Sequence, residues 1–335
     1  MNQLIISEFE RLVQHLQHEY LTNKETNLRF KISNFKKVIA ILKQYPTEIT
    51  SGEELKSIRG IGKGAIQRID EIIQNKFLNE IPKVNSEDSE INEINNLLRV
   101  TGIGPSNAKK MFKNGITLDK LISETDNYWD TLTHHQKIGV SYFKDFEKKI
   151  PRIEIKSIEN KISKLLQKID SNLKMYVCGS YRRNKIESGD IDVLITHEEI
   201  VNSEDLEDNN ILSNIINFLT EKNILVDHLT INGNTKYMGV CKLTSRSYGR
   251  RIDIRLIPKE SIGCALLYFT GCGDFNVNMR SYASKKGYKI NEYNLLKKVG
   301  TKFIPVKINS EKDIFNKLGL EYIEPSERLS NVKFE

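Results

Sequence analysis

The stretch that decides the fold is VCGSYRRNKIESGDIDVLI, residues 177–195. Its second half alternates polar and apolar side chains, which in a β-strand point to opposite faces. Asp190 and Asp192 should therefore project from one face, while Ile191 and Val193 enter a core. Because two neighbouring carboxylates repel each other, the pattern indicates a bound cation, for which magnesium is the natural candidate. An exposed turn followed by an edge strand with solvated aspartates is the alternative.

A second β-rich run, RIDIRLI at residues 251–257, has the same alternation. Asp253 in this run can complete a carboxylate triad from a neighbouring strand. Such a triad suits a two-metal-ion reaction, in which one Mg²⁺ lowers the pKa of a primer 3′-hydroxyl and the other neutralises a triphosphate and the leaving pyrophosphate. Asp253 would bind only the first ion and accept the hydroxyl proton. Gly179 and Ser180 offer donors to the β- and γ-phosphates, and Arg183 offers a forked cation.

A repeat in the first half of the chain predicts two helical hairpins. GIGKGA at residues 60–65 is echoed by GIGPSNA at residues 102–108, and a helix is expected after each copy. The glycines permit a tight turn close to a phosphate, and the following helix N-terminus attracts anions. Lys63 and Lys109 add positive charge. The repeat therefore predicts contacts with a DNA backbone, although a single copy would also fit an ordinary helix end and turn.

Composition is consistent with a soluble protein that binds an anion. The 335-residue chain has a net charge of +7, which favours a partner such as nucleic acid. Its four cysteines form no CxxC pair and lie near no histidine at zinc spacing, so reduced, mostly buried thiols are expected. No membrane span or signal peptide is expected, which predicts an intracellular protein without a membrane partner. Helical periodicity extends to about residue 150, and short β-rich runs follow at residues 175–177, 191–195 and 252–257. Beyond them, helices are expected at about 261–269 and 274–286, and short strands around 289–290 and 303–306.

The sequence is similar to the family X DNA polymerases, and most of all to DNA polymerase beta. The similarity covers nearly the whole chain and is carried by LLRVTGIGPSNAKK (97–110), LTHHQKIGVSYFKDFEKKIPR (132–152), RRIDIRLIPK (250–259), LYFTG (267–271) and EKDIF (311–315). It implies an α+β multidomain fold, with helical helix-hairpin-helix domains followed by a nucleotidyltransferase palm with a mixed sheet and a small α/β nucleotide-selecting subdomain. The expected parts are a lyase-like, 5′-phosphate-binding domain (1–84), a duplex-binding subdomain (85–149), the catalytic palm (150–259) and a nascent base-pair-binding subdomain (260–335).

The resemblance also implies roles for individual residues. Tyr268 and Phe269 would pack against the incoming sugar and reject a 2′-hydroxyl, and Gly271 would lie at a cis-peptide turn. The expected nucleotide contacts are Gly179, Ser180, Arg183, Ser188, Gly189, Lys149, Tyr268, Phe269, Gly271 and Asn276. The expected DNA contacts are Gly60, Gly62, Lys63, Gly102, Gly104, Lys109, Arg251, Arg280 and Glu292. The backbone carbonyls expected to hold a monovalent cation, Na⁺ or K⁺, are those of Lys56, Ile58, Ile61, Leu98, Val100 and Ile103.

The resemblance also implies a lyase activity, but the sequence differs from the family at the residue that carries it. In the family, a lysine in the helix after the first hairpin attacks an abasic sugar to form a Schiff base, which needs an amine that can lose its proton. The matching residue here is Arg68, which stays charged at neutral pH. The 5′-deoxyribose phosphate lyase activity is therefore either lost or moved to Lys63 or Lys31. If it is lost, this region would only grip the downstream 5′-phosphate.

These observations predict a template-dependent DNA polymerase that fills short gaps from a primer 3′-hydroxyl, as in base excision repair. Gapped or nicked duplex DNA and dNTPs are the expected partners, a DNA ligase is a further candidate, and a monomer is expected in the nucleus or, for a viral protein, the host cytoplasm. A template-independent terminal transferase is one alternative, although residues 244–249 form a short loop where such enzymes carry a long one. A non-catalytic DNA-binding protein is another, which Asp190, Asp192 and Asp253 argue against.

Overall fold

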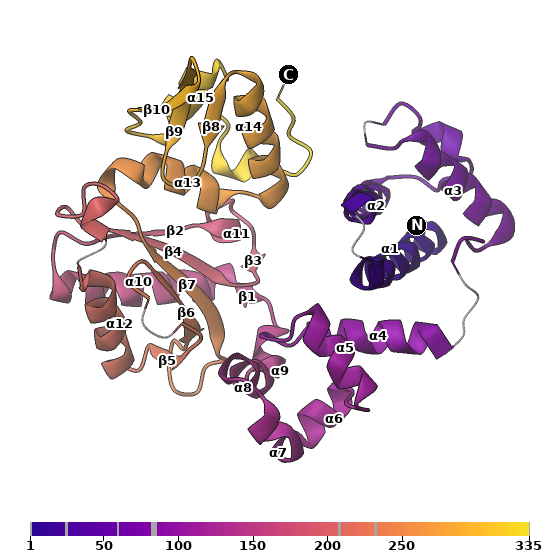
Figure 1. Cartoon of the computed structure of the whole chain (residues 1–335), viewed down its shortest axis with the longest axis horizontal. Coiled ribbons are helices and arrows are strands. Elements are labelled where there is room, and N and C mark those ends of the chain that lie inside the picture. Colours follow the sequence, from indigo (N-terminus) through magenta and orange to yellow (C-terminus); the bar gives the residue numbers. More distant parts are fainter. Residues whose placement is uncertain are drawn as a thin grey trace. The chain divides into compact units, whose positions relative to one another are not determined.

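The chain divides into two compact units, residues 1–140 and 141–335. Within the described residues the first unit is helical, and every strand lies in the second unit (Figure 1). This order confirms the expected α+β class, while the expected boundary at residues 84 and 85 lies outside the described residues. The computed structural model describes residues 2–23, 26–58, 60–81, 86–206, 209–230 and 233–334.

The first unit begins with two long helices, α1 (Gln3–Asn23) and α2 (Thr26–Gln44), which pack against each other. Apolar residues at helical spacing form the contact, and the rings of Phe9 and Phe35 meet edge to face at 5.7 Å. No described helix is both long and apolar enough to cross a membrane. The unit continues with η1 (Gly52–Leu55), α3 (Lys63–Asn75), α4 (Ser86–Leu98), α5 (Pro105–Lys113), α6 (Leu118–Ser123), α7 (Thr125–Tyr128), η2 (Trp129–Thr131) and α8 (His134–Ser141).

The second unit contains a five-stranded mixed sheet with the strand order β2-β4-β7-β6-β5. β4 and β7 run parallel, and the other neighbouring pairs are antiparallel. The three β-rich runs of the sequence are β2, β4 and β7, but the sequence pattern does not predict β5, in which the polar residues Asp227 and His228 follow only two apolar ones, or β6, which Gly239 interrupts. The bounds are β2 (Lys174–Val177), β4 (Ile191–Thr196), β5 (Leu225–His228), β6 (Lys236–Cys241) and β7 (Arg250–Leu256).

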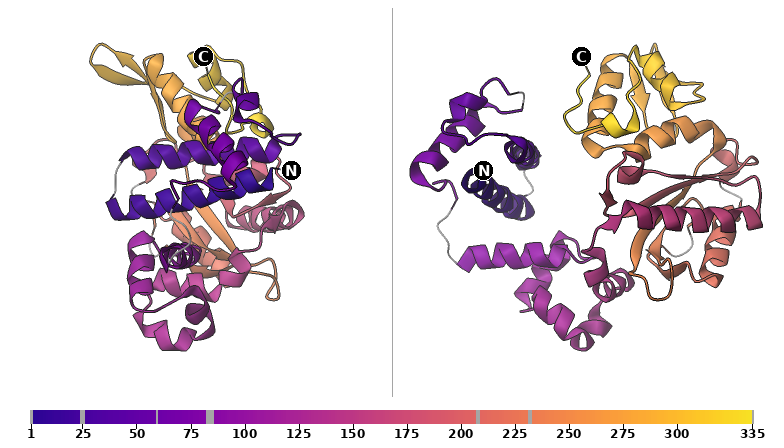
Figure 2. Two further views of the ribbon diagram at one scale, coloured as in Figure 1. Left: turned by 90° about the vertical axis from the view of Figure 1, so that its right-hand side faces the viewer. Right: turned by 180° about the vertical axis from the view of Figure 1, so that it is seen from behind.

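The two faces of this sheet differ. Alternate residues of β4 and β7 pack under the helices α10 (Arg152–Ile169) and α12 (Ile211–Glu221), and α10 crosses the sheet in Figure 2. On the other face Leu194 packs against Ala265 of the helix α13 (Ile262–Thr270). Because strand side chains alternate, the acidic residues of β4 and β7 belong to this second face. Short elements beside the sheet are α9 (Phe143–Phe146), β1 (Ile150–Pro151), α11 (Gly179–Arg182), β3 (Glu187–Ser188), η3 (Glu204–Leu206) and η4 (Lys259–Ser261).

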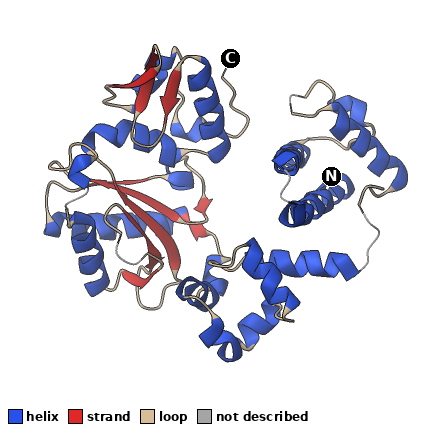
Figure 3. Ribbon diagram, viewed as in Figure 1, coloured by secondary structure: helices blue, strands red, loops and turns tan. Residues whose placement is uncertain are grey.

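The second unit ends in a smaller α/β part with a three-stranded antiparallel sheet, ordered β10-β9-β8 (Figure 3). The sequence pattern predicts α13, α14, β8 and β10. It does not predict β9, which is rich in lysine, or α15, a short helix that begins with a capping box at Ser310. The bounds are α14 (Gly273–Lys285), β8 (Tyr288–Ile290), β9 (Leu295–Val299), β10 (Lys302–Val306), α15 (Glu311–Leu318) and η5 (Pro325–Glu327).

A buried ion cluster ties the smaller part to the five-stranded sheet. Glu311 at the start of α15 accepts hydrogen bonds from Arg182 of α11 and, at 2.6 Å, from the fully buried Arg328. Arg182 also donates to Thr270 at the end of α13. Burial would raise the pKa of the Glu311 carboxyl, but the two guanidiniums outweigh burial and hold that pKa below its ordinary value. The cluster therefore fixes α15 and α13 on α11.

Candidate active site

Asp192 and Asp253 lie opposite each other on the adjacent parallel strands β4 and β7. Both side chains leave the sheet on the face that α10 and α12 do not cover, and such strands lie only about 4.8 Å apart. Asp190 directly precedes β4, and its charge acts on Asp192 together with that of Asp253. The structure thus brings together the three aspartates that the sequence pattern groups.

The strand aspartates are held in an unfavourable environment for their charged form. Burial, and then the charges of Asp190 and Asp253, raise the pKa of Asp192 to about 7, while Arg251 and Arg183 act in the opposite direction. Burial also raises the pKa of Asp253. Arg251 Nη2 lies 3.5 Å from Asp190 Oδ2, which compensates the three carboxylates only in part.

The donor set of this cluster fits a divalent cation. Carboxylate oxygens are ligands that Mg²⁺ prefers, and Asp253 Oδ1 is buried without a hydrogen-bond partner among the described residues. In the part of the chain that the structure describes, no three His, Cys, Asp or Glu side chains converge closely enough to hold a metal ion as they stand. The chemistry of the cluster therefore suits Mg²⁺.

Gly179 allows the backbone to approach these carboxylates. It has a φ of +56°, and a Cβ built there would lie 2.1 Å from Asp192 Oδ2. Helix α11, which begins at Gly179, packs against β3, where Ser188 has a buried Oγ without a partner among the described residues. Lys149 Nζ lies 3.7 Å from the position of a Cβ on Gly189. Most groups that the resemblance assigns to the triphosphate therefore lie around α11 and β3.

Ser180 and Arg183 lie on α11 and directly after it. The Arg183 guanidinium donates to the carbonyl oxygen of Thr270, so its fork is directed at the end of α13. The Gly271–Cys272 peptide bond, which directly follows the Thr270–Gly271 bond at the end of α13, is cis, as the resemblance implies. The Arg183–Thr270 contact therefore connects α11, whose residues the resemblance assigns to the triphosphate, with α13, which carries Tyr268 and Phe269.

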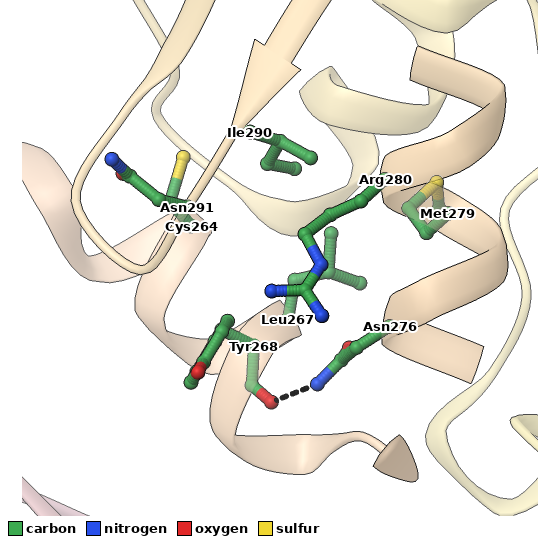
Figure 4. A pocket seen from close by; sticks show the side chains of 8 residues that line it. All are labelled: Cys264, Leu267, Tyr268, Asn276, Met279, Arg280, Ile290 and Asn291. Atoms are coloured by element: carbon green, nitrogen blue, oxygen red, sulfur yellow. Dashed lines mark hydrogen bonds between the residues drawn. The ribbon is translucent and has the colours of Figure 1, made fainter. Parts of the chain in front are cut away.

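Helices α13 and α14 line a small pocket that contains three residues assigned to the nucleotide and template (Figure 4). Asn276 Nδ2 donates to the carbonyl oxygen of Tyr268 at 2.6 Å, and Arg280 follows Asn276 by one helical turn. Phe269 lies outside this lining, with its ring 5.6 Å from Arg255 Cζ. The sequence reasoning does not single out the other lining residues, which are Cys264, Leu267, Met279, Ile290 and Asn291.

Two lining residues that the sequence reasoning missed, and one residue that it assigned, show what such reasoning can and cannot find. Met279 could have been found, because it is three residues from Asn276 on the same helix. Ile290 gave no such signal, because it reaches the pocket from a separate strand. Glu292, which the resemblance assigns to the DNA contacts, is half-buried beside the lining residue Asn291 but does not itself line the pocket.

The two glycine hairpins of the first unit have matching geometry. Gly60 and Gly102 have positive φ values of +110° and +88°. Gly62 and Gly104 precede α3 and α5 with φ/ψ of −95°/170° and −89°/171°. The sequence repeat is therefore a structural repeat, with a free helix N-terminus after each turn. The lysines assigned to DNA are Lys63, which is exposed, and Lys109, which is half-buried.

The carbonyl groups assigned to a monovalent cation also match between the hairpins. The amide of Ile61 donates to the carbonyl of Ile58 at 3.1 Å, and Ile103 donates to Val100 at 3.0 Å. A carbonyl oxygen has two lone pairs, so each acceptor keeps one for another ligand. Of the four remaining assigned carbonyls, those of Lys56 and Leu98 lie two residues before these acceptors, and those of Ile61 and Ile103 belong to the donating residues.

Arg68 on α3 is held by neighbours on all sides of its guanidinium. Its Nε and Nη2 donate to both oxygens of Glu80, the latter at 2.8 Å, and its Nη1 donates to the carbonyl of Gly64 at 2.8 Å. The guanidinium carbon also lies 5.0 Å from the centre of the Phe35 ring. Lys31, one of the alternative nucleophiles, is exposed on α2. The residue at the family's lysine position is therefore neutralised within the domain.

Family models match four consecutive parts of the chain. These are a helix-hairpin-helix domain (residues 1–76), the fingers domain of DNA polymerase lambda (95–147), the DNA polymerase beta palm (149–259) and the DNA polymerase beta thumb (265–329). The three aspartates all fall within the palm match.

Proteins that align with most of this chain agree with these family matches. DNA polymerase lambda of Arabidopsis thaliana is 30% identical over 315 residues, which cover 88% of this chain and 57% of that protein. DNA polymerase lambda of Rattus norvegicus is 31% identical over 314 residues, which cover 90% and 52%. DNA nucleotidylexotransferase of Xenopus laevis is 25% identical over 363 residues, which cover 98% and 68%. The chain spans little more than half the length of the two polymerases.

Proposed function

The chain belongs to family X of the DNA polymerases, and on this premise we propose that it adds deoxynucleotides to a primer 3′-hydroxyl opposite a template and fills short gaps in duplex DNA, as in base excision repair. The observation that carries the proposal is the pair Asp192 and Asp253, side by side on the sheet face that α10 and α12 do not cover, with Asp253 Oδ1 buried and unsatisfied among the described residues. A sheet that buries like charges in this way needs a cationic ligand.

Asp190, Asp192 and Asp253 would hold magnesium in two positions, where its charge assists ionisation of the primer hydroxyl and binding of the triphosphate. Asp253 Oδ1, which lacks a partner among the described residues, would accept the hydroxyl proton. Gly179 would admit the chain of phosphates close to the backbone, because a side chain there would meet Asp192. The other phosphate contacts would come from Ser180, Arg183, Ser188, Gly189 and Lys149.

The pocket between α13 and α14 would hold the nascent base pair. Tyr268 and Phe269 would pack against the incoming sugar, and Arg280 would touch the template strand. Asn276 would donate to the minor-groove edge of the incoming base, because its side-chain NH2 has a second N–H besides the one that the Tyr268 carbonyl accepts. The two hairpins would contact the DNA backbone, each with a monovalent cation, because their turns present amides and carbonyls of the same geometry.

Template-independent synthesis is the second candidate, because DNA nucleotidylexotransferase is among the similar proteins. The loop between β6 and β7 favours templated synthesis. It is short and held by its own hydrogen bonds, including Ser247 N to Thr244 O at 3.1 Å, and Gly249 N donates to Asp145 at 2.7 Å. Such a loop leaves little free chain to replace a template strand.

Primer extension tests this proposal. Purified protein should extend a primer in a one-nucleotide gap only with the dNTP complementary to the template, and should leave the single-stranded primer unextended under the same conditions. Equal extension of both substrates would support the terminal transferase, and extension of neither would contradict both candidates.

We also propose that the first unit grips the downstream 5′-phosphate without lyase chemistry. An amine must lose its proton to attack the sugar, and the guanidinium of Arg68 stays charged and is paired with Glu80. Borohydride trapping on an incised abasic site tests this: no covalent adduct is expected. An adduct that disappears in Lys63→Ala or Lys31→Ala would instead show that the nucleophile has moved.

The proposed partners are gapped or nicked DNA and dNTPs, with a DNA ligase as a candidate for the following step. A monomer is expected in solution. The protein would act where such DNA occurs, in the nucleus or, for a viral protein, in the host cytoplasm.

A further inference from the structure

The segment Leu329–Phe334 lies along helix α14 in the smaller part of the second unit (Figures 1 and 2). Its side chains alternate: Val332 and Phe334 are half-buried against the apolar core, while Asn331 and Lys333 are exposed. The alternation means that the segment packs against the core through Val332 and Phe334.

The Phe334 ring contacts two anchors of α14. It meets the ring of Phe275 at 5.5 Å in an edge-to-face arrangement and the ring of Tyr282 at 5.7 Å. Phe275 is completely buried, and Tyr282 is nearly so. Because these residues are seven positions apart, they lie on one face of the helix two turns from each other. A single aromatic side chain therefore spans the inner face of α14.

Two further contacts fix the segment. Asn278 of α14 donates its side-chain amide to the carbonyl oxygen of Val332 at 2.6 Å. Just before the segment, the fully buried Arg328 donates to Glu311 at 2.6 Å and to the carbonyl of Ile323 at 3.0 Å. The segment is thus held at its start by the ion cluster, in the middle by Asn278 and at Phe334 by aromatic contacts.

The same helix carries residues of the candidate site: Met279 lies on the face of Phe275 and Tyr282, and Asn276 and Arg280 lie on the adjacent side. Asn276, Met279 and Arg280 line the pocket that α14 shares with Tyr268 (Figure 4). A rotation of α14 by a fraction of a turn would displace these side chains relative to Tyr268, because a helix moves as a rigid body. The contacts of Phe334 oppose such a rotation.

We propose that Phe334, with Val332, positions α14 and thereby sets the fit of Asn276 and Arg280 to the nascent base pair. Phe334 is a positioning residue, since it acts through the helix and does not line the pocket. The inference rests on the proposed polymerase function and adds a determinant of nucleotide selection to it. A purely structural role would lower stability without changing how the folded enzyme discriminates between nucleotides.

Steady-state gap filling with Phe334→Ala in the 335-residue chain tests the inference at a temperature where the variant is folded. The KM for the correct dNTP should rise roughly three- to tenfold, as expected for loss of two aromatic contacts. The kcat should change less, and the affinity for gapped DNA should stay the same. Discrimination against mismatched dNTPs should fall by a similar factor. Phe334→Tyr, which keeps the ring, should restore KM and discrimination.

Lys333→Ala is the matched control, because this neighbouring side chain points to solvent. It should leave KM, discrimination and the melting temperature unchanged. A Phe334→Ala enzyme that melts at lower temperature but has wild-type KM and discrimination would overturn the positioning role and leave the proposed function intact. Absence of nucleotide incorporation by the wild-type protein would instead contradict the proposed function, while the melting temperatures would still test the packing of the segment.

Discussion

The carboxylates of the sheet and the Arg68 region of the first unit are both charged, but they differ in how far neighbouring residues balance that charge. In the sheet, Asp192 faces Asp253 across neighbouring strands, and Asp253 Oδ1 has no partner among the described residues. In the first unit, all three guanidinium nitrogens of Arg68 donate hydrogen bonds, two of them to Glu80. One group needs a ligand to balance its charge, and the other is balanced by its own chain.

The difference helps to separate the two activities that the family resemblance implies. Two carboxylates about 5 Å apart repel by roughly 3 kcal/mol at an effective dielectric constant near 20. A fold keeps such a cost where it serves a function, because active sites hold charges that the rest of a protein avoids. The oppositely charged Arg68 and Glu80 carry no comparable electrostatic repulsion. We therefore expect substitutions at the two places to have opposite consequences.

The largest effect is expected from Asp253→Asn. The substitution keeps the shape of the side chain but removes a charge and a proton acceptor, so nucleotide incorporation should fall on the order of a thousandfold or more. Binding to gapped DNA should remain within about twofold, because the hairpins and the pocket between α13 and α14 are unchanged. Primer extension and a fluorescence binding assay measure the two quantities. Glu221→Gln, an exposed carboxylate on α12, is the control, and wild-type extension by Asp253→Asn would refute the assigned role.

The next largest effect concerns Glu311, a carboxylate of the same unit whose charge is balanced. Glu311→Gln should destabilise the protein by about 3–5 kcal/mol, because it leaves Arg182 and Arg328 without their buried partner. Chemical denaturation measures this loss, and the exposed Glu321→Gln should show none of it. A loss below about 1 kcal/mol would mean that the cluster is not needed for stability.

The pH dependence of the same variant follows from the lowered pKa of Glu311. A carboxyl group whose pKa is lowered by folding stabilises the protein above its ordinary pKa of 4.5, and this contribution is lost as the pH falls toward the folded-state pKa. The unfolding free energy of the wild type should therefore fall more steeply below about pH 4.5 than that of Glu311→Gln. Parallel curves would contradict the charge balance.

A smaller effect of the opposite sign is expected at Asp192. Asp192→Asn removes a buried charge that Asp190 and Asp253 repel, so it should stabilise the metal-free protein by about 1–3 kcal/mol while abolishing incorporation. Thermal melting in the presence of a chelator measures the gain. Added Mg²⁺ should raise the melting temperature of the wild type more than that of the variant. A variant less stable than the wild type in chelator would show that the aspartates are balanced within the chain.

Sequence patterns predict the sheet carboxylates better than they predict the balance of charges around them. The period-two alternation in β4 and β7 is local, so it predicts both strands and the common face of Asp192 and Asp253. The pattern does not show that these two strands pair in parallel, nor does it show β6, which lies on the other side of β7. The ion pair of Arg68 joins residues twelve positions apart, and that of Arg182 and Glu311 joins residues 129 apart. Such pairs depend on tertiary packing, for which the sequence holds no local signal.

The smallest expected effect is the appearance of lyase chemistry when the ion pair between Arg68 and Glu80 is removed. Arg68→Lys alone should give little borohydride-trapped adduct, because Glu80 would raise the pKa of the new amine and keep it protonated. Arg68→Lys combined with Glu80→Gln removes that partner and should raise trapping on an incised abasic site roughly tenfold over the wild type. Lys31→Ala in the double variant should leave the adduct in place. Strong trapping by the wild type would break the contrast between the two regions, because a balanced Arg68 would then coexist with an active nucleophile elsewhere on the domain.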